Sequence, residues 1–188
     1  SLWDEQLAKS AAHIVEKRFI VVKKLNMLAN LMQRRISAGK ENLSLSYELC
    51  GAEDEPPCVT EELVPWYNKK LEESLDLDVL RGSTSVGPQR DDIRLEVNGV
   101  NLRSFGSQGQ QRTGVLALKL SELEFLRSET GEYPVLLLDD VMSELDERRS
   151  VALMDFVQGT IQSVVTTANL GNFPKKLLDR AKLIGIGK

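Results

Sequence analysis

The chain has 188 residues, a formal net charge of −4 and a hydrophobic content of 41%, which is typical of a soluble globular protein. No apolar run approaches the length needed to span a bilayer, and the polar, acidic start of the sequence lacks the basic region of a secretory signal. We therefore expect a protein of the reducing cytoplasm with no membrane partner, in which Cys50 and Cys58 stay reduced.

The charges are distributed unevenly along the chain. Residues 9–40 carry eight basic side chains and one acid, whereas residues 41–80 carry eleven acids and two bases. The basic segment is either a contact for a phosphate backbone or a solvated helix face, and composition leaves both interpretations open. The candidate DNA contacts are Lys17, Arg18, Lys23, Lys24, Arg34 and Arg35.

The first part of the chain predicts a helix, a strand and a second helix. Apolar residues recur at helical spacing without Pro or Gly across residues 2–37, so we expect one long amphipathic helix, with Gly39 as its C-cap. Polar and apolar residues alternate over 42–49, which is typical of a strand with one solvated face. A helix over 60–76 follows, with Thr60 as its N-cap.

A composition shift after residue 82 marks a predicted domain boundary, with a mainly helical part over residues 1–82 and a second part over residues 83–188. The second part opens with alternating residues over 92–97. An Asn-Gly turn signal follows, and it predicts a hairpin whose return strand covers 100–105.

Helices and strands alternate in the rest of the second part. A polar loop at 106–109 precedes a long, deeply packed helix to about residue 128. The apolar run 135–138 does not alternate, so it predicts a central strand buried on both faces. Further elements are expected at 146–158 (helix), 161–166 (strand), 174–178 (helix) and 182–186 (strand). This order predicts an α/β fold with a parallel sheet.

The strongest motif is the pair of carboxylates, Asp139 and Asp140, that ends this apolar strand. Ligands of open α/β sheets bind outside the carboxyl ends of the strands. Neighbouring residues on a strand point to opposite faces, so the two acids have different tasks. One can hold Mg²⁺ through its water shell, and the other can orient or deprotonate an attacking water. The alternative is that these carboxylates cap the next helix.

Two further motifs are weaker when taken singly. Residues 107–112, Ser-Gln-Gly-Gln-Gln-Arg, precede the long helix, where glycine permits close approach of a ligand and free N–H groups favour phosphate. Residues 143–146, Ser-Glu-Leu-Asp, follow the acidic strand. A plain polar loop explains the first motif equally well, and a helix cap at Ser143 or Asp146 explains the second.

In this order, the three motifs resemble the signature motif, Walker B strand and D-loop of an ABC-type ATPase head. In detail they resemble the RecF family of bacterial recombination-repair ATPases, over essentially the whole chain from Leu2. The segments that carry the resemblance are LWDEQL (2–7), TSVGPQRDD (84–92), SQGQQRT (107–113) and LDDVMSELD (138–146). The resemblance implies the C-terminal half of an ABC-type head in residues 83–188, and a lid-like second domain in residues 1–82.

The resemblance also implies a role for each motif residue. Asp139 matches the Mg²⁺-associated carboxylate, and Asp140 matches the catalytic carboxylate. Most ABC heads have glutamate at the second position, and a shorter side chain fits slow hydrolysis. Ser143 and Asp146 match the D-loop, which lies across the dimer interface. The signature motif, which contacts the γ-phosphate of ATP on the opposite subunit, corresponds to Ser107, Gln108, Gly109, Gln110, Gln111 and Arg112.

The family implies partners as well: DNA at gaps and junctions, RecR and RecO, RecA loaded on single strands, and a second subunit that dimerises with ATP. Two positions depart from the pattern. Gln89 stands where the family usually has histidine. Thr166 and Thr167 stand where many ABC heads place a switch histidine, so no histidine contact to the γ-phosphate is expected.

The sequence contains no Gly-x-x-x-x-Gly-Lys-Ser/Thr loop, which would cradle the β- and γ-phosphates. In the RecF family this loop lies in the N-terminal half. We therefore expect ATP and Mg²⁺ to bind in the full-length protein and no cofactor to bind this chain alone. Without its neighbours, the sheet is expected to show an exposed edge and some bare core.

Three alternatives compete with this interpretation. An SMC-like structural head would use the first helix as the stump of a coiled coil, but that helix lacks sustained heptads. A stand-alone metal-dependent hydrolase would use Asp139, Asp140 and Asp146 together. A module without chemistry would bind DNA or RecR.

Overall fold

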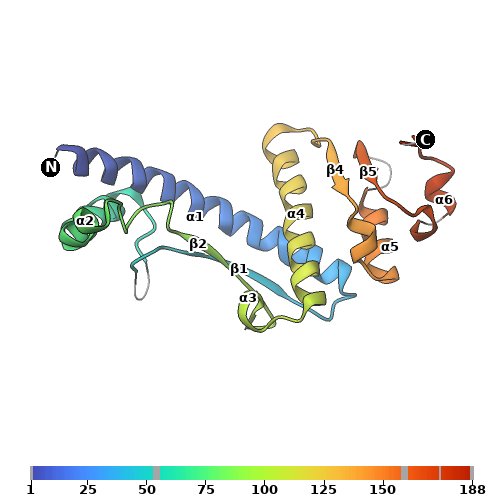
Figure 1. Cartoon of the computed structure of the whole chain (residues 1–188), viewed down its shortest axis with the longest axis horizontal. Helices are drawn as coiled ribbons and strands as arrows, with labels where there is room; N and C mark the ends of the chain where they lie inside the picture. Colours follow the sequence, from blue (N-terminus) through green and yellow to red (C-terminus); the bar gives the residue numbers. More distant parts are fainter. Residues whose placement is uncertain (1, 53–55, 158–160, 174, 187–188) are drawn as a thin grey trace. The chain divides into compact units, whose positions relative to one another are not determined.

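Figure 1 shows the computed structural model of the chain, which describes residues 2–52, 56–157, 161–173 and 175–186. The helices are α1 (Leu2–Ile36), α2 (Thr60–Arg81), α3 (Leu102–Phe105), α4 (Gln108–Thr130), α5 (Glu147–Val157) and α6 (Lys175–Leu178). The strands are β1 (Leu43–Glu48), β2 (Asp92–Val97), β3 (Val100–Asn101), β4 (Leu136–Asp139) and β5 (Ser163–Thr166). Two 3-10 turns, η1 (Val141–Glu144) and η2 (Leu170–Asn172), complete the described elements.

The contacts divide the chain into two units. One comprises Ser1–Met27 with Ser44–Glu96, and the other comprises Leu28–Leu43 with Val97–Lys188. The division into residues 1–82 and 83–188 stays a prediction. Among the described residues, no helix combines the length and the apolar character that crossing a membrane requires.

The expected long first helix is confirmed as α1. Gly39 contributes to its end, but as the second residue beyond the cap rather than as the cap itself. The Gly39 N–H bonds to the Arg34 carbonyl at 2.7 Å, and Ala38 has φ 53°. This is the Schellman arrangement, in which the last helical carbonyls regain donors.

The expected second helix is confirmed as α2, which runs five residues beyond its predicted end at Asp76. Thr60 is its first residue and not its N-cap; Val59 holds that position without a side-chain bond. Glu16 of α1 accepts a hydrogen bond from the Thr60 N–H (3.2 Å), which has no partner within the helix, and another from the Thr60 hydroxyl (2.8 Å). The hydroxyl bond is the main cause that lowers the pKa of Glu16.

Strand β1 confirms the predicted alternation, with buried Leu43, Leu45 and Tyr47 on one face. The sheet order is β1-β2-β3. The predicted return strand over 100–105 is largely wrong, because β3 has two residues and α3 follows at once. The Asn101 side chain accepts from the Ser104 N–H and so starts a helical turn, which competes with an extended strand.

In the first unit, a polar cluster at Tyr47 ties α1 and β1 to the GPQRDD segment. The Tyr47 hydroxyl donates to Asp91 at 2.5 Å, and Arg18 donates to that hydroxyl (3.2 Å) and to the Pro88 carbonyl (2.5 Å). Burial is the largest cause raising the pKa of Tyr47 to about 12. The hydroxyl therefore keeps its proton and stays a donor.

The second unit is built on α4 and the β4–β5 pair, with α5 between the two strands in the chain (Figure 1). The strands are parallel, with Leu137 beside Val164 and Asp139 beside Thr166. The predicted α/β fold with a parallel sheet is confirmed. Helix α4 buries one long face, which comprises Thr113, Gly114, Leu116, Ala117, Leu120, Ser121 and Leu123.

Two strand predictions in this unit are wrong. Residues 135–138 are not buried on both faces: Leu137 is 72% exposed, and its neighbour Val164 is 53% exposed. One face of the β4–β5 pair is therefore bare among the described residues. Residues 182–186 form no strand, because no described strand offers hydrogen-bond partners to their backbone. The predicted boundaries at Gln158 and Pro174 lie outside the described residues.

Candidate functional site

The carboxyl end of the β4–β5 pair gathers three of the residues singled out from the sequence. The Thr166 hydroxyl donates to Asp139 Oδ1 at 2.5 Å, and it accepts from the Asp140 N–H at 3.1 Å. One threonine thus joins the two acids across the parallel pair. Thr166, at a position where many ABC heads place a switch histidine, here holds the end of β4 in place.

Asp140 has a left-handed backbone conformation, with φ 48° and ψ 22°, which aspartate tolerates better than most residues. This conformation turns the chain out of β4 and into η1. The Ser143 hydroxyl lies 2.8 Å from the Asp140 carbonyl oxygen and 2.9 Å from Oδ2. Ser143 therefore stabilises the turn that presents the Asp140 carboxylate to solvent.

The donor set fits a water-mediated Mg²⁺ ion. Asp139 Oδ1 is engaged with Thr166, so Oδ2 is the oxygen of this carboxylate that can face an ion's water shell. Hard oxygen ligands of this kind suit Mg²⁺. Within the described ranges, no three His, Cys, Asp or Glu side chains are grouped to hold a metal. Asp139, Asp140 and Asp146 thus do not form the three-carboxylate site of a stand-alone hydrolase.

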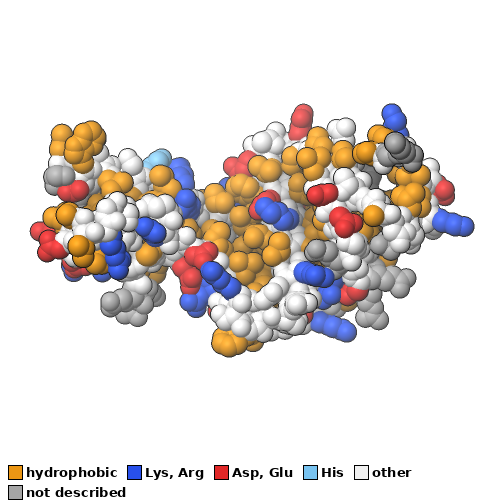
Figure 2. Space-filling model, in the orientation of Figure 1, with side chains coloured by type: hydrophobic (Ala, Val, Ile, Leu, Met, Phe, Trp, Pro, Cys, Tyr) orange, Lys and Arg blue, Asp and Glu red, His pale blue; other side chains and the backbone are white. Residues whose placement is uncertain are grey.

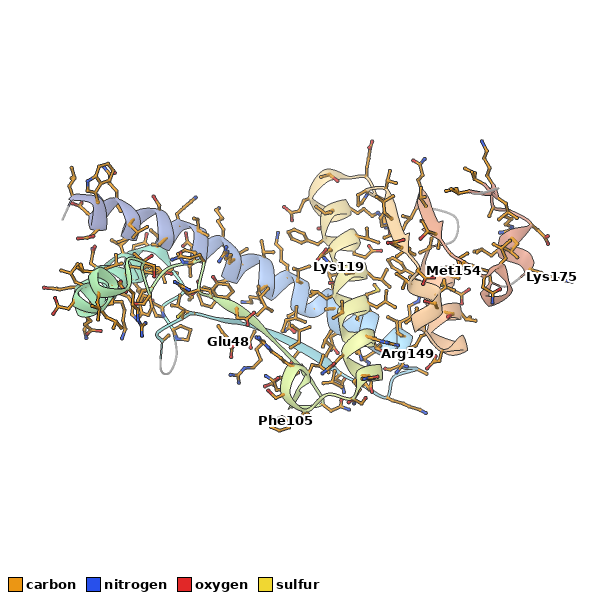
Figure 3. The ribbon with its side chains drawn as sticks, in the orientation of Figure 1. Glu48, Phe105, Lys119, Arg149, Met154 and Lys175 are labelled. Atoms are coloured by element: carbon orange, nitrogen blue, oxygen red, sulfur yellow. The ribbon has the colours of Figure 1, made fainter. Side chains whose placement is uncertain are left out.

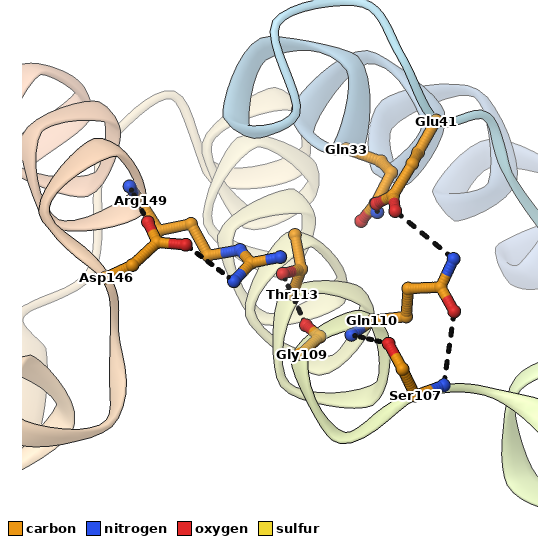
Figure 4. Close-up of polar contacts among 8 residues, drawn as sticks. All are labelled: Gln33, Glu41, Ser107, Gly109, Gln110, Thr113, Asp146 and Arg149. Atoms are coloured by element: carbon orange, nitrogen blue, oxygen red, sulfur yellow. Dashed lines mark hydrogen bonds and ion pairs between the residues drawn. The ribbon is translucent and has the colours of Figure 1, made fainter.

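The signature-like loop is closed by a capping box at the start of α4 (Figure 4). The Gln110 N–H donates to Ser107 Oγ at 3.2 Å, and the Ser107 N–H donates to Gln110 Oε1 at 3.1 Å. This reciprocal pair satisfies two helix-end donors. Ser107, Gln108 and Arg112 are exposed, and Gln111 donates to the Leu102 carbonyl at 2.9 Å.

Two charged residues that sequence reasoning missed hold this loop from either side. Glu41 accepts a hydrogen bond from Gln110 Nε2 at 3.2 Å and another from the buried Gln33 Nε2 at 2.7 Å. Arg149, which Figure 3 labels, approaches Gly109, so that a Cβ there would lie 3.4 Å from its Nη atoms (Figure 4). No local pattern points to either residue, because both contacts are distant in sequence.

Asp146 is engaged within its own chain. Its Oδ1 accepts from the Arg149 N–H at 2.9 Å, which caps α5, and its Oδ2 accepts from the Arg149 guanidinium at 2.8 Å. The helix-cap explanation of the Ser-Glu-Leu-Asp motif therefore describes Asp146 in this conformation. The Arg149 guanidinium that Asp146 binds also lies close to Gly109.

The six basic residues proposed as DNA contacts differ in their surroundings. All six are exposed, but Arg18 is directed to Tyr47 and Pro88, and the Tyr47 bond is the main cause that raises its pKa. Arg34 bonds to Asn42 at 3.2 Å, and Arg35 lies over the Phe156 ring. On the face shown in Figure 2, basic and acidic side chains are interspersed.

Gln89 lies in a tight turn of the GPQRDD segment, closed by a 2.8 Å bond from the Arg90 N–H to the Gly87 carbonyl. Its amide donates to Thr84 Oγ1 at 3.3 Å. Gly87 has φ 144°, and a Cβ there would meet Gln89 Oε1 at 2.5 Å. The Gln89 side chain could move aside, so it is the positive φ that favours glycine at this position.

The comparisons with known proteins give a consistent result. No family model matches the chain. It is 46% identical over 171 residues to the DNA replication and repair protein RecF of Halothermothrix orenii, which covers 91% of the chain and 46% of that protein. The RecF of Acaryochloris marina is 42% identical over 185 residues, covering 98% of the chain and 49% of that protein.

The chain is also similar to solved structures of RecF proteins. A structure of the recombination mediator protein RecF with ATPrS in the RecFOR pathway has a TM-score of 0.76 and 38% identity, and covers 90% of the chain. Its counterpart with ATP has a TM-score of 0.74 and 37% identity. The chain spans about half the length of the relatives it matches, between 45% and 49% in these comparisons. It is homologous to these RecF proteins over that length.

Proposed function

We propose that the chain is the C-terminal half of a RecF-type DNA repair and recombination mediator. The full-length protein binds ATP and DNA, dimerises with ATP and helps to load RecA at single-strand gaps and junctions. The observation that supports this most directly is the end of β4, where Asp139 and Asp140 leave the sheet joined by Thr166. The relatives' name, DNA replication and repair protein RecF, and the RecF structure with ATP agree with it.

In this proposal the acids at the strand end divide the work of phosphoryl transfer. Bound ATP would supply the γ-phosphoryl group, and Mg²⁺ would neutralise charge on its oxygens. Asp139 would hold the ion through water. Asp140 orients the attacking water and accepts its proton. Its exposed position and its turn held by Ser143 support that role.

The signature-like loop serves the second protomer. Ser107 and Gly109 stand at the start of α4, where N–H groups and the helix dipole favour phosphate. We assign Gln108, Gln110, Gln111 and Arg112 to the same motif, and Ser143 and Asp146 to the D-loop. The cytoplasmic partners of the full-length protein would be RecR, RecO and RecA, with DNA at single-strand gaps.

The bare face of the β4–β5 pair is proposed to pack against the N-terminal half of the protein, which supplies the phosphate loop. Leu137→Lys should then leave this chain's free energy of unfolding within about 0.5 kcal/mol, because the side chain is exposed. Its affinity for a separately produced N-terminal half should fall about 100-fold, because a charge would be buried. Titration calorimetry measures the affinity of the unchanged chain and of Leu137→Lys for the N-terminal half.

Leu126→Lys, at an exposed position on α4 rather than on β4, is the matched control for that experiment. Equal affinity of Leu137→Lys and the unchanged chain for the N-terminal half would show that this face is not the interface.

The proposed DNA contact at α1 predicts a change in salt dependence. Lys17→Gln and Lys24→Gln together remove two phosphate contacts. The negative slope of log K against log salt should then become shallower by about 2, because each contact releases about one counterion. Fluorescence anisotropy with the full-length protein on duplex DNA at several salt concentrations measures the slope.

The double variant Lys69→Gln with Lys119→Gln removes the same charge from α2 and α4, and it controls for net charge. An identical slope in the α1 variant and this control would assign the basic segment to a solvated helix face.

The function itself is tested by nucleotide-dependent DNA binding. The full-length protein should bind a gapped duplex more tightly with ATP and Mg²⁺ than with ADP, since the ATP dimer presents two DNA contacts. Equal affinity in both states would contradict a DNA mediator controlled by ATP.

A further inference from the structure

The signature-like loop is tied to the end of α1 by one carboxylate (Figure 4). Glu41 follows α1, and its partner Gln110 lies 69 positions later, in the first turn of α4. The two oxygens of Glu41 take different donors: Oε2 accepts from Gln33 Nε2 at 2.7 Å, and Oε1 accepts from Gln110 Nε2 at 3.2 Å. A charged acceptor makes both bonds stronger than bonds between neutral groups.

Glu41 determines which way the Gln110 amide faces. An ionised carboxylate only accepts, so the Gln110 NH₂ must point towards it. The amide oxygen then points to the Ser107 N–H and accepts a hydrogen bond from it at 3.1 Å. The opposite orientation would place an oxygen against the carboxylate and an NH₂ against an N–H. Glu41 therefore fixes the capping box, and the box fixes Ser107.

The Gln33 side chain lowers the stability of the fold if its only role is structural. Its side chain is fully buried, and its Oε1 has no hydrogen-bond partner within the described chain. A buried, unpaired carbonyl destabilises the fold, and an apolar side chain would suit this face of α1 better. The contact that the glutamine does make is with Glu41, so its benefit is the orientation of that carboxylate.

The loop is held on its other side as well. The guanidinium of Arg149, bonded to Asp146, lies close to Gly109, where a Cβ would be in van der Waals contact with its Nη atoms at 3.4 Å. With Glu41 on one side and Arg149 on the other, the first turn of α4 has little freedom to shift alone. A displacement of the end of α1 would therefore be passed to Ser107.

We propose that Glu41 is a positioning residue, which sets the Ser107 loop to receive the ATP of a second protomer and couples that loop to the end of α1. The inference rests on the proposed function, because it needs the loop to act in trans. Glu41 does not touch the nucleotide in this proposal; it acts through Gln110.

Glu41→Gln tests this in the full-length protein. The variant keeps the size of the side chain but removes its charge, so Gln33 and Gln110 lose their charged acceptor. ATP-dependent dimerisation, measured by analytical ultracentrifugation, should weaken about ten-fold, because one charge-assisted bond is lost. The affinity of the monomer for ATP should be unchanged. Amide exchange across residues 103–112 should become faster.

Two further variants keep the test decisive. Glu122→Gln removes the same charge from α4, at a surface pair with Lys119, and it should dimerise like the unchanged protein. Gln33→Leu should not lower the unfolding temperature, yet it should weaken dimerisation as Glu41→Gln does. If Glu41→Gln does not fold, Gln33→Leu tests the proposal alone.

The outcomes separate this inference from the proposed function. If Ser107→Arg abolishes ATP-dependent dimers while Glu41→Gln dimerises normally, the coupling through Glu41 is wrong and the trans site stands. Equal weakening by Glu41→Gln and Glu122→Gln would also overturn the coupling. If Ser107→Arg still dimerises with ATP, the proposed function itself fails.

Discussion

Asp140→Asn is expected to lower the ATP turnover of the full-length protein by about 10²–10⁴-fold, because an amide cannot accept a proton from the attacking water. The fold should be preserved, since asparagine tolerates the left-handed conformation of this residue. Its side-chain oxygen can still accept from Ser143. ATP-dependent dimers should therefore form and persist longer than those of the unchanged protein. Steady-state phosphate release and light scattering measure the two effects.

Asp76→Asn, at an exposed position of α2, is the matched control and should leave turnover unchanged. A normal rate in Asp140→Asn would remove Asp140 from the role of general base.

Ser107→Arg should abolish ATP-dependent dimerisation of the full-length protein while each monomer still binds ATP. The arginine places bulk and positive charge where the γ-phosphate of the opposite protomer is proposed to approach. It also removes the cap that Ser107 Oγ gives to the Gln110 N–H, which costs about 1 kcal/mol of stability. Ultracentrifugation with ATP gives the oligomeric state, and nucleotide binding by the monomer is measured separately.

The loss of the cap is separated from the steric effect by Ser107→Ala, which loses the cap without adding bulk. Ser128→Arg, near the other end of α4, introduces the same side chain away from the loop and should dimerise normally. Dimers of Ser107→Arg in the presence of ATP would refute the trans contact.

The sequence predicts those elements whose signals are local. Helix α4 could be predicted from a polar loop followed by a long apolar helical pattern. In the structure, a capping box of Ser107 and Gln110 starts this helix, and Gly131 with φ 83° ends it. Strand β4 and its acidic end could be predicted from an apolar run followed by two carboxylates. These features depend on neighbours in the chain, and neighbours are what a single sequence shows.

The features that the sequence did not predict depend on distant contacts. The exposed face at Leu137 reflects which elements cover the sheet, and an apolar run cannot show that. Helix α3 replaces most of the expected return strand because Asn101 caps a turn, although the local pattern also suits a strand. Glu41 meets Gln110 from 69 positions away, so no spacing rule could have linked them. Arg18 was grouped with DNA contacts by charge, but Tyr47 and Pro88 engage it.

We propose that this chain carries the Walker B and signature parts of an ATPase head whose phosphate loop lies in the N-terminal half of the full-length protein. Titration calorimetry of ATP and Mg²⁺ against this chain, with and without the separately produced N-terminal half, tests it most directly. We expect no measurable ATP binding by the chain alone and binding once the N-terminal half is added. ATP binding by the chain alone would contradict it, because the phosphate site would then lie within these 188 residues.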